Sequence, residues 1–173
     1  MKVLVAYASR LGSTEVIAKR IAARLRGDGL AATAHDLGTP TSPGDYDAFV
    51  IGSAVYAGHW LDVATEFAHE HSTLLARLPV WLFSSGPLGG AEASRAAVPA
   101  EIRGLEVSLR ANEHRMFAGA FARDTVDDGG FGVGERFIAR RFVPQGDFRD
   151  WPAIDAWADE IARELHVSPV VHA

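Results

Sequence analysis

A cluster of hydroxyl side chains around one glycine follows the first apolar run of the chain. The cluster is the hexapeptide Ser9, Arg10, Leu11, Gly12, Ser13 and Thr14. A bound phosphate needs several backbone N–H groups that converge at a helix N-terminus, and hydroxyls that satisfy its remaining lone pairs. The glycine permits close approach of the backbone, the hydroxyls donate hydrogen bonds, and the arginine can add a charge-assisted one. The hexapeptide therefore predicts a phosphate site, with an ordinary Ser/Thr helix cap as the alternative.

Other phosphate-binding or catalytic loops would place different residues here. A dinucleotide fingerprint requires G-x-G-x-x-G, whereas only Gly12 is present, and a P-loop requires G-K-[ST], which is missing. A phospho-accepting receiver domain carries acidic residues where this chain has Ala8, Ser9 and Ser53. Residues 52–54 do not match the G-x-S-x-G nucleophile elbow of a hydrolase. The sequence therefore excludes a dinucleotide-binding fold of this type, a P-loop protein, a receiver domain and a hydrolase with a nucleophile elbow, because the residues that each requires are missing.

A second group, of small and aromatic residues, follows the third predicted strand. It comprises Ser53, Ala54, Val55, Tyr56, Ala57, Gly58, His59 and Trp60. Small residues let the backbone approach a flat ring, and Tyr56 and Trp60 offer faces for stacking. Gly58 would permit its peptide bond with Ala57 to flip and present a carbonyl to a ring N–H. Packing of the two aromatic side chains against the next helix is equally open, and an exposed loop position is the favoured interpretation of His59.

A third group, rich in glycine, follows the fourth predicted strand. It comprises Ser84, Ser85, Gly86, Pro87, Leu88, Gly89 and Gly90. No helix-starting hydroxyls follow it, so it does not match a phosphate loop. It would suit the far side of a planar ring, and taken alone it would equally suit a surface turn. Three such groups at the ends of neighbouring strands indicate a ligand site more strongly than any one of them.

The elements that must position these groups alternate between strand-like apolar runs and helical periods, as in βαβ units. Strands are predicted over 2–7, 31–37, 47–52, 79–85 and 115–121, and helices over 12–27, 61–77, 91–109 and 151–166. Pro99 and Gly104 would interrupt the third helix, residues 38–44 form a loop in place of a helix, and residues 123–150 form an insertion. The prediction is a single α/β domain over 1–173 with a doubly wound, five-stranded parallel sheet in three layers. Such sheets bind ligands at the carboxyl ends of the strands.

Composition removes several further possibilities. The chain has 173 residues and no cysteine, which excludes disulfides, thiolate catalysis and cysteine-ligated iron–sulfur clusters. The net charge of −5 offers no basic field for nucleic acid. His69 and His71 are two apart on a predicted helix and point to different faces, so no metal site is expected. The apolar run 3–6 is too short for a signal-peptide core and no membrane-spanning stretch is found, so we expect a cytoplasmic protein. Trp81, Trp151 and Trp157 are expected in the core.

On these three groups the sequence resembles the flavodoxins, and the resemblance covers most of the chain. It is most similar to the branch that contains the menaquinone-linked protoporphyrinogen dehydrogenases. The residues that indicate this branch are 52–54 with 58–59, Phe117-x-Gly119 followed by Asp124, and 146–151. The resemblance implies the strand order 2-1-3-4-5 and flavin mononucleotide (FMN) as the cofactor. Flavodoxins bind FMN at the carboxyl ends of the strands, where the strand order reverses. The expected position of FMN is therefore taken from the family.

By this resemblance, the FMN phosphate is held by Ser9, Arg10, Gly12, Ser13 and Thr14, and the isoalloxazine is bordered by residues 53–58 and 86–89. Asp124 could reach the flavin rim or form a turn. Two features depart from the family pattern: Leu11 replaces a hydroxyl, and the surface is less acidic than that of electron-shuttling flavodoxins. Arg136, Arg140 and Arg141 flank apolar residues in the insertion, where a solvated helix face is favoured over a peripheral membrane or quinone contact.

Two functional classes remain. The first is an FMN-dependent oxidoreductase that passes electrons or hydride to a quinone-type or other acceptor, with a porphyrinogen-type small molecule as a candidate substrate. The second is a carrier that exchanges electrons with protein partners. A flavin-free structural homologue is a third interpretation, and Leu11 is the residue that supports it. The oligomeric state is not predicted.

Overall fold

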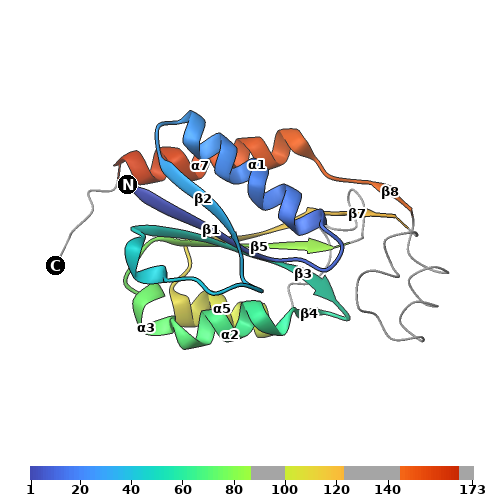
Figure 1. Ribbon diagram of the computed structural model, residues 1–173, viewed down its shortest axis with the longest axis horizontal. Coiled ribbons are helices and arrows are strands. Elements are labelled where there is room, and N and C mark those ends of the chain that lie inside the picture. The colour runs from blue at the N-terminus through green and yellow to red at the C-terminus, as the bar shows by residue number, and fades with distance from the viewer. Residues whose placement is uncertain (87–99, 123–144, 168–173) are drawn as a thin grey trace.

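A five-stranded parallel sheet forms the middle layer of the protein, with helices on both faces (Figure 1). The computed structural model describes residues 1–86, 100–122 and 145–167. The strands are β1 (Lys2–Ala8), β2 (Ala31–Asp36), β3 (Ala48–Tyr56), β5 (Val80–Gly86) and β6 (Glu113–Ala118). They lie in the order β2-β1-β3-β5-β6, with all neighbours parallel. Counted in chain order, these five strands have the predicted order 2-1-3-4-5, so the predicted fold class is confirmed.

The register of the sheet brings three strand ends together. Ala8 at the end of β1 pairs with Ser53, and Ser53 pairs with Ser84 on β5. On the other side of β5, Gly86 pairs with Ala118 at the end of β6. The helix that follows β1 and the helix that follows β3 lie on opposite faces of the sheet. The strand order therefore reverses between β1 and β3, and the carboxyl ends of these strands form the switch point at which doubly wound sheets bind ligands.

One face of the sheet is covered by α1 (Ser13–Gly27) and α7 (Trp151–Val167). The core on this face contains Trp81, Phe83 and Trp157, and the rings of Phe83 and Trp157 meet edge to face at 6.2 Å. Trp151 is half-buried against the same core. The expected burial in the core is therefore confirmed for Trp81 and Trp157, whereas Trp151 lies at the margin of the core.

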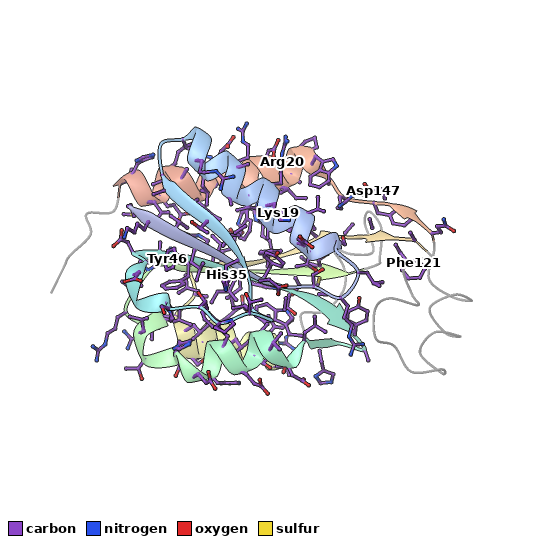
Figure 2. The ribbon with its side chains drawn as sticks, in the orientation of Figure 1. Lys19, Arg20, His35, Tyr46, Phe121 and Asp147 are labelled. Atoms are coloured by element: carbon purple, nitrogen blue, oxygen red, sulfur yellow. The ribbon has the colours of Figure 1, made fainter. Side chains whose placement is uncertain are left out.

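The opposite face is covered by α2 (Asp62–Glu70), α3 (Ser72–Leu75) and α5 (Ala100–Leu109). The central strands are apolar on both faces, as in parallel sheets with helices on each side. α1 and α7 are joined across their outer surface by the ion pairs Arg20–Asp155 and Arg24–Asp159, both bidentate. Figure 2 shows Lys19 and Arg20 on this outer side of α1.

Several predicted boundaries are wrong. The third strand continues to Tyr56 instead of ending at residue 52, because residues 53 and 54 keep pairing with β5. The helix predicted over 61–77 is divided between α2 and α3 at His71. Gly104 does not interrupt α5, which runs from residue 100 to residue 109. The loop predicted at 38–44 is present and leads into one turn of 3₁₀-helix, η1 (Pro43–Asp45).

The strand predicted over 115–121 is two strands. β6 ends at Ala118, and β7 (Ala120–Phe121) pairs antiparallel with β8 (Gly146–Asp147) in a separate small sheet. The division falls at Gly119, whose N–H donates to the carbonyl of Gly86 at the end of β5. Of the predicted insertion, residues 145–150 are described, while the basic patch at 136–141 and Asp124 lie outside the described residues.

Candidate functional site

The loop after β1 leads into α1 through a glycine in the left-handed region. Gly12 has φ +80°, which is strained for any residue with a side chain. The first intrahelical hydrogen bond runs from the N–H of Val16 to the carbonyl of Gly12. The amides of residues 13–15 precede that bond, so they belong to the helix end whose N–H groups lack intrahelical acceptors. This end also carries the positive partial charge of the helix dipole.

Two hydroxyls at this helix end are buried without a partner. The Oγ of Ser9 and the Oγ1 of Thr14 have no hydrogen-bond partner among the described residues, and Thr14 is only 1% exposed. No side-chain cap hydrogen bond is found at the N-terminus of α1, so the ordinary-cap alternative is not what the structure shows. Buried hydroxyls without partners are costly, at about 1–3 kcal/mol each. Their placement therefore fits a ligand group that is rich in hydrogen-bond acceptors.

Ser13 has a different role from the other two hydroxyls. Its Oγ accepts the N–H of Ala120, 2.8 Å away, and so links the start of α1 to β7. Gly119 lies beside this link: a Cβ there would be 2.9 Å from the carbonyl oxygen of Gly86 and 3.1 Å from the hydroxyls of Ser13 and Ser85. The ends of β5 and β6 and the start of α1 are thus packed together at a glycine.

Arg10 extends toward the ring of Tyr56. Its guanidinium carbon lies 5.4 Å from the ring centroid, a cation–π distance. Burial raises the pKa of the Tyr56 phenol to about 12, with the nearby Arg10 charge acting in the opposite direction. The phenol is therefore neutral at physiological pH. Leu11, the next residue of this loop after Arg10, is half-buried.

The second group, residues 53–60, is mostly strand. Ser53 to Tyr56 form the last part of β3, and Ser53 and Ala54 are buried. The Ser53 hydroxyl accepts the N–H of Leu61 and donates to the carbonyl of Ala54. This side chain therefore anchors the start of α2. The predicted end of the third strand at residue 52 was wrong because small residues suit a buried strand end as well as the residues after it.

Only two residues of that group form the turn. Ala57 and Gly58 have φ of 50° and 83° and connect β3 to the two-residue strand β4 (His59–Trp60). Positive φ at both central residues is the signature of a type I′ hairpin turn. The turn is exposed, and His59 is tied to α5 by a 3.2 Å contact between its Nδ1 and Glu101. The expected exposed position of His59 is confirmed.

Trp60 is buried, with 3% of its surface exposed. Its indole N–H donates to the Oγ of Ser84 over 2.8 Å, and that oxygen lies 2.8 Å from Nε2 of His114. Burial lowers the pKa of His114 to about 4. The Ser84 oxygen thus accepts the indole N–H and is also within hydrogen-bond distance of the imidazole. Trp60 therefore follows the packing alternative, and its hydrogen bond holds β4 against β5.

The sequence did not single out His114. It occurs once within a strand, without a spaced partner, so no pattern could have connected it to Trp60 and Ser84. In the third group, Ser85 is buried and Gly86 is the half-buried last residue of β5. Pro87, Leu88 and Gly89 lie outside the described residues.

A hollow of about 370 Å³ lies beside the start of α1. Leu11 and Ser13 form one side, and Phe121 and Arg149 from the β7–β8 region form another. Figure 2 shows Phe121 and Asp147 at this end of the molecule. Arg149 is held by a bidentate ion pair with Asp147 and stacks on Trp151 at 4.7 Å. The positive charge of Arg149 is thus neutralised by the neighbouring carboxylate of Asp147.

The doubly wound parallel sheet, with helices on both faces and an α-helix that begins after Gly12 at the carboxyl end of β1, defines an α/β domain of the flavodoxin-like class. The Flavodoxin domain family matches residues 4–127 of the sequence. The chain therefore belongs to the flavodoxin-domain family.

The proteins to which the chain is similar include a dehydrogenase and, among solved structures, several flavodoxins. Protoporphyrinogen IX dehydrogenase [quinone] of Escherichia coli K12 is 31% identical over 86 residues, which cover 49% of this chain and 48% of that protein. The chain thus matches about half the length of this curated relative. Flavodoxin 1 from Bacillus cereus is 15% identical with a TM-score of 0.62, covering 97% of this chain and 100% of that one.

Two further solved structures show the same fold. A cysteine mutant of the Pseudomonas aeruginosa flavodoxin is 18% identical with a TM-score of 0.60, covering 96% of this chain and 99% of that one. Rubredoxin oxygen:oxidoreductase from Desulfovibrio gigas is 16% identical with a TM-score of 0.62, and the match covers 95% of this chain and 36% of that one. Among the helices within the described residues, none is long and apolar enough to cross a membrane.

Proposed function

We propose that this protein binds FMN at the carboxyl edge of its sheet and transfers electrons or hydride through it to a quinone-type or other acceptor. The observation that carries the proposal is the pair of buried hydroxyls of Ser9 and Thr14 at the N-terminus of α1, which have no hydrogen-bond partner within residues 1–86, 100–122 and 145–167. Family membership and the flavodoxin-like fold support FMN in particular as the ligand. When bound, FMN supplies the electron and hydride chemistry.

The phosphate would be held by the loop after β1 and the first turn of α1. The N–H groups of residues 13–15 and the hydroxyls of Ser9 and Thr14 can donate to its oxygens, while Gly12 leaves room for close approach. The side chain of Leu11 cannot donate a hydrogen bond. This loop therefore offers the phosphate one hydrogen bond fewer than a loop with a hydroxyl residue at position 11. Ser13 supplies its backbone N–H and is held in place by its link to Ala120.

The ring would lie between the end of β3 and the segment that follows β5. Residues 53–58 form one border, in which Tyr56 offers an aromatic face and the Ala57–Gly58 turn offers a backbone carbonyl. The end of β5, at Ser85 and Gly86, would form the other border. Trp60 acts indirectly, because its buried indole holds β4 and therefore the turn. Together these residues would orient the ring and exclude water from one of its faces.

The similarity to a quinone-linked dehydrogenase favours an enzyme. A carrier is the second candidate, and the exposure of Ala57, Gly58 and His59 favours it, since a ring bordered by that turn would have an edge near a protein partner. Anaerobic reduction followed by addition of a quinone separates the two candidates. Catalytic turnover with a quinone and a porphyrinogen supports the enzyme, and single-equivalent exchange with no small-molecule turnover supports the carrier.

The first test is an FMN titration of the purified apo-protein, followed by flavin fluorescence and the visible spectrum. We expect one-to-one quenching. Thr14→Ala should raise the Kd by about 10- to 150-fold, because a hydrogen bond to a charged group contributes about 1.5–3 kcal/mol. Gly12→Val should weaken binding further, because a β-branched residue is strained at φ +80°.

Matched substitutions in the loop at residues 38–44 serve as controls. Thr39→Ala removes an exposed hydroxyl that donates to the carbonyl of Asp36, and Gly44→Val adds a side chain where no atom lies within 4 Å. Both should leave the Kd for FMN unchanged. If the Thr14 and Gly12 variants bind FMN as well as these controls do, the phosphate site is wrongly placed.

A further inference from the structure

The turn at Ala57 and Gly58 is carried by a very short strand. β4 (His59–Trp60) is two residues long and pairs antiparallel with the end of β3. Figure 1 shows β4 at the end of β3, at the carboxyl edge of the sheet. A two-stranded ribbon of this size has little stability of its own, so the turn keeps one position only if other elements hold β4.

A buried side-chain contact supplies that support. The indole N–H of Trp60 donates to the Oγ of Ser84 over 2.8 Å, and Nε2 of His114 lies 2.8 Å from the same oxygen. One hydroxyl therefore connects β4 with β5 and β6. A second contact of β4, from Nδ1 of His59 to Glu101 at 3.2 Å, lies on the surface, where such pairs contribute little. The contact through Ser84 is shielded from water and is the stronger of the two.

Ser84 is placed to act on a ligand indirectly. It is 0% exposed, and its oxygen is already within hydrogen-bond distance of two side chains. It pairs in register with Ser53, whose hydroxyl accepts the N–H of Leu61 and so fixes the chain just after β4. Any influence of Ser84 on a ring at the edge of the sheet must therefore pass through Trp60 and the turn.

We propose that Ser84 and His114 are positioning residues for the flavin ring, because together they hold Trp60 and, with it, the Ala57–Gly58 turn that borders the ring. The inference rests on the proposed function. If the hydrogen bond to Trp60 were missing, ligand binding would have to order the hairpin, and that ordering would reduce the affinity. The reduction would be the same for every ligand that has the ring, with or without a phosphate.

Comparing FMN with riboflavin tests this assignment, because riboflavin has the same ring and no phosphate. Ser84→Ala should raise the Kd of both ligands by the same factor, about 2- to 10-fold, the range of one neutral hydrogen bond. Trp60→Phe breaks the same hydrogen bond from its other end and should have the same effect. Either variant tests the inference if the other does not fold, and thermal melting identifies the folded variants.

Trp157→Phe is the matched control. It removes an indole N–H that donates to Glu113 over 2.7 Å on the opposite face of the sheet, so it should lower stability and leave both Kd values unchanged. Unchanged riboflavin affinity in folded Ser84→Ala or Trp60→Phe overturns the inference. An equal loss of affinity in Trp157→Phe also overturns it, because general destabilisation would then explain the effect.

A double-mutant cycle tests whether the three side chains act together. In a Ser84→Ala background, Trp60→Phe and His114→Leu should each cause no further loss of riboflavin affinity, since the hydroxyl that connects them is absent. Additive losses would show independent action and overturn the inference. Visible circular dichroism of the bound flavin is a second readout, which a purely structural role would not change. It should change in Ser84→Ala and stay the same in Trp157→Phe, and an unchanged spectrum in Ser84→Ala contradicts the positioning role.

The failure of this inference differs from the failure of the proposed function. If the unsubstituted protein binds neither FMN nor riboflavin, both proposals are wrong. If it binds FMN, and the folded Ser84→Ala and Trp60→Phe variants bind both ligands as tightly as it does, the proposed function stands and only the positioning role fails.

Discussion

Gly52 shows how a single residue determines the packing beside the site. It lies in the middle of β3, opposite Phe83 on β5, and the Phe83 ring occupies the space where a side chain would be. A Cβ built on Gly52 would lie 2.0 Å from a ring carbon. The backbone conformation of Gly52 is that of an ordinary strand. The glycine is therefore required by the position of the Phe83 ring, not by its φ angle.

We therefore expect Gly52→Ala to destabilise the protein by about 3 kcal/mol or more, the cost of overpacking a closed core. Gly104→Ala is the matched control, because Gly104 is exposed within α5 and no atom lies within 4 Å of its added Cβ. That change should stabilise the protein by about 0.5–1 kcal/mol through the higher helix propensity of alanine. Urea denaturation monitored by circular dichroism measures both. Equal effects of the two substitutions would contradict this account of Gly52.

Ser84 connects two buried polar groups through one hydroxyl. Replacing Ser84 with alanine leaves the Trp60 N–H and Nε2 of His114 without their partner, so we expect a loss of about 1–3 kcal/mol in unfolding free energy. Ser108→Ala, which removes an exposed hydroxyl that donates within its own helix, should cost less than about 0.5 kcal/mol. If both variants unfold at the same urea concentration, the hydrogen-bond chain contributes no net stability.

At the level of elements, the hairpin of β3 and β4 depends on a strained turn. A type I′ turn is favoured by Asn-Gly, whereas this chain has alanine at the first left-handed position, with φ 50°. The strain at Ala57 is compensated by the burial of Trp60 and by the hydrogen bonds of β4. The turn geometry is therefore imposed by the packing of β4, the strand after the turn.

Substitutions in the turn should change stability in opposite directions. Ala57→Asn should stabilise the protein by about 0.5–1 kcal/mol, because asparagine tolerates the left-handed conformation. Gly58→Val should destabilise it by about 1–2 kcal/mol, since φ of 83° is strained for a β-branched residue. Gly44→Val, at a glycine outside the left-handed region, is the control for the added side chain. The same denaturation midpoint for both valine variants would argue against strain at the turn.

At the scale of the whole molecule, acid sensitivity should depend on His114. This residue lies on β6 beside Leu82 of β5, and burial gives it a folded-state pKa of about 4 against 6.5 for the free side chain. Between these two values the unfolded chain binds the proton more readily than the folded protein does, so stability increases with pH across this window. Stability from this group is complete above pH 6.5 and is lost as the pH falls through 4.

The unsubstituted protein should therefore lose about 2 kcal/mol of stability through this residue between pH 7 and pH 4, an amount reduced from the full shift because the imidazole retains some solvent contact. His114→Gln should remove this part of the pH dependence while leaving the rest. Urea denaturation at a series of pH values gives the two curves. Parallel curves for the two proteins would mean that His114 does not sense the pH through its burial.

Periodicity and composition alone determined the fold class and the burial of Trp81 and Trp157, and the family resemblance added the strand order. These features depend on local apolar patterns: runs with both faces apolar are typical of central parallel strands, and spacing of three or four is typical of helices against them. The loop from Ser9 to Thr14 was found for a similar reason, since a phosphate site at a helix start lies within six consecutive residues.

Only the tertiary structure decided how those residues are used. The three hydroxyls of the first loop look equivalent in sequence. In the structure the Ser13 hydroxyl accepts a hydrogen bond from the N–H of Ala120 on β7, whereas those of Ser9 and Thr14 have no partner among the described residues. Trp60 faces the core instead of a ligand because Ser84 and His114, distant in the chain, accept and continue its hydrogen bond. Such pairings depend on strand register, which a linear pattern does not encode, and register is set by the packing of the whole sheet.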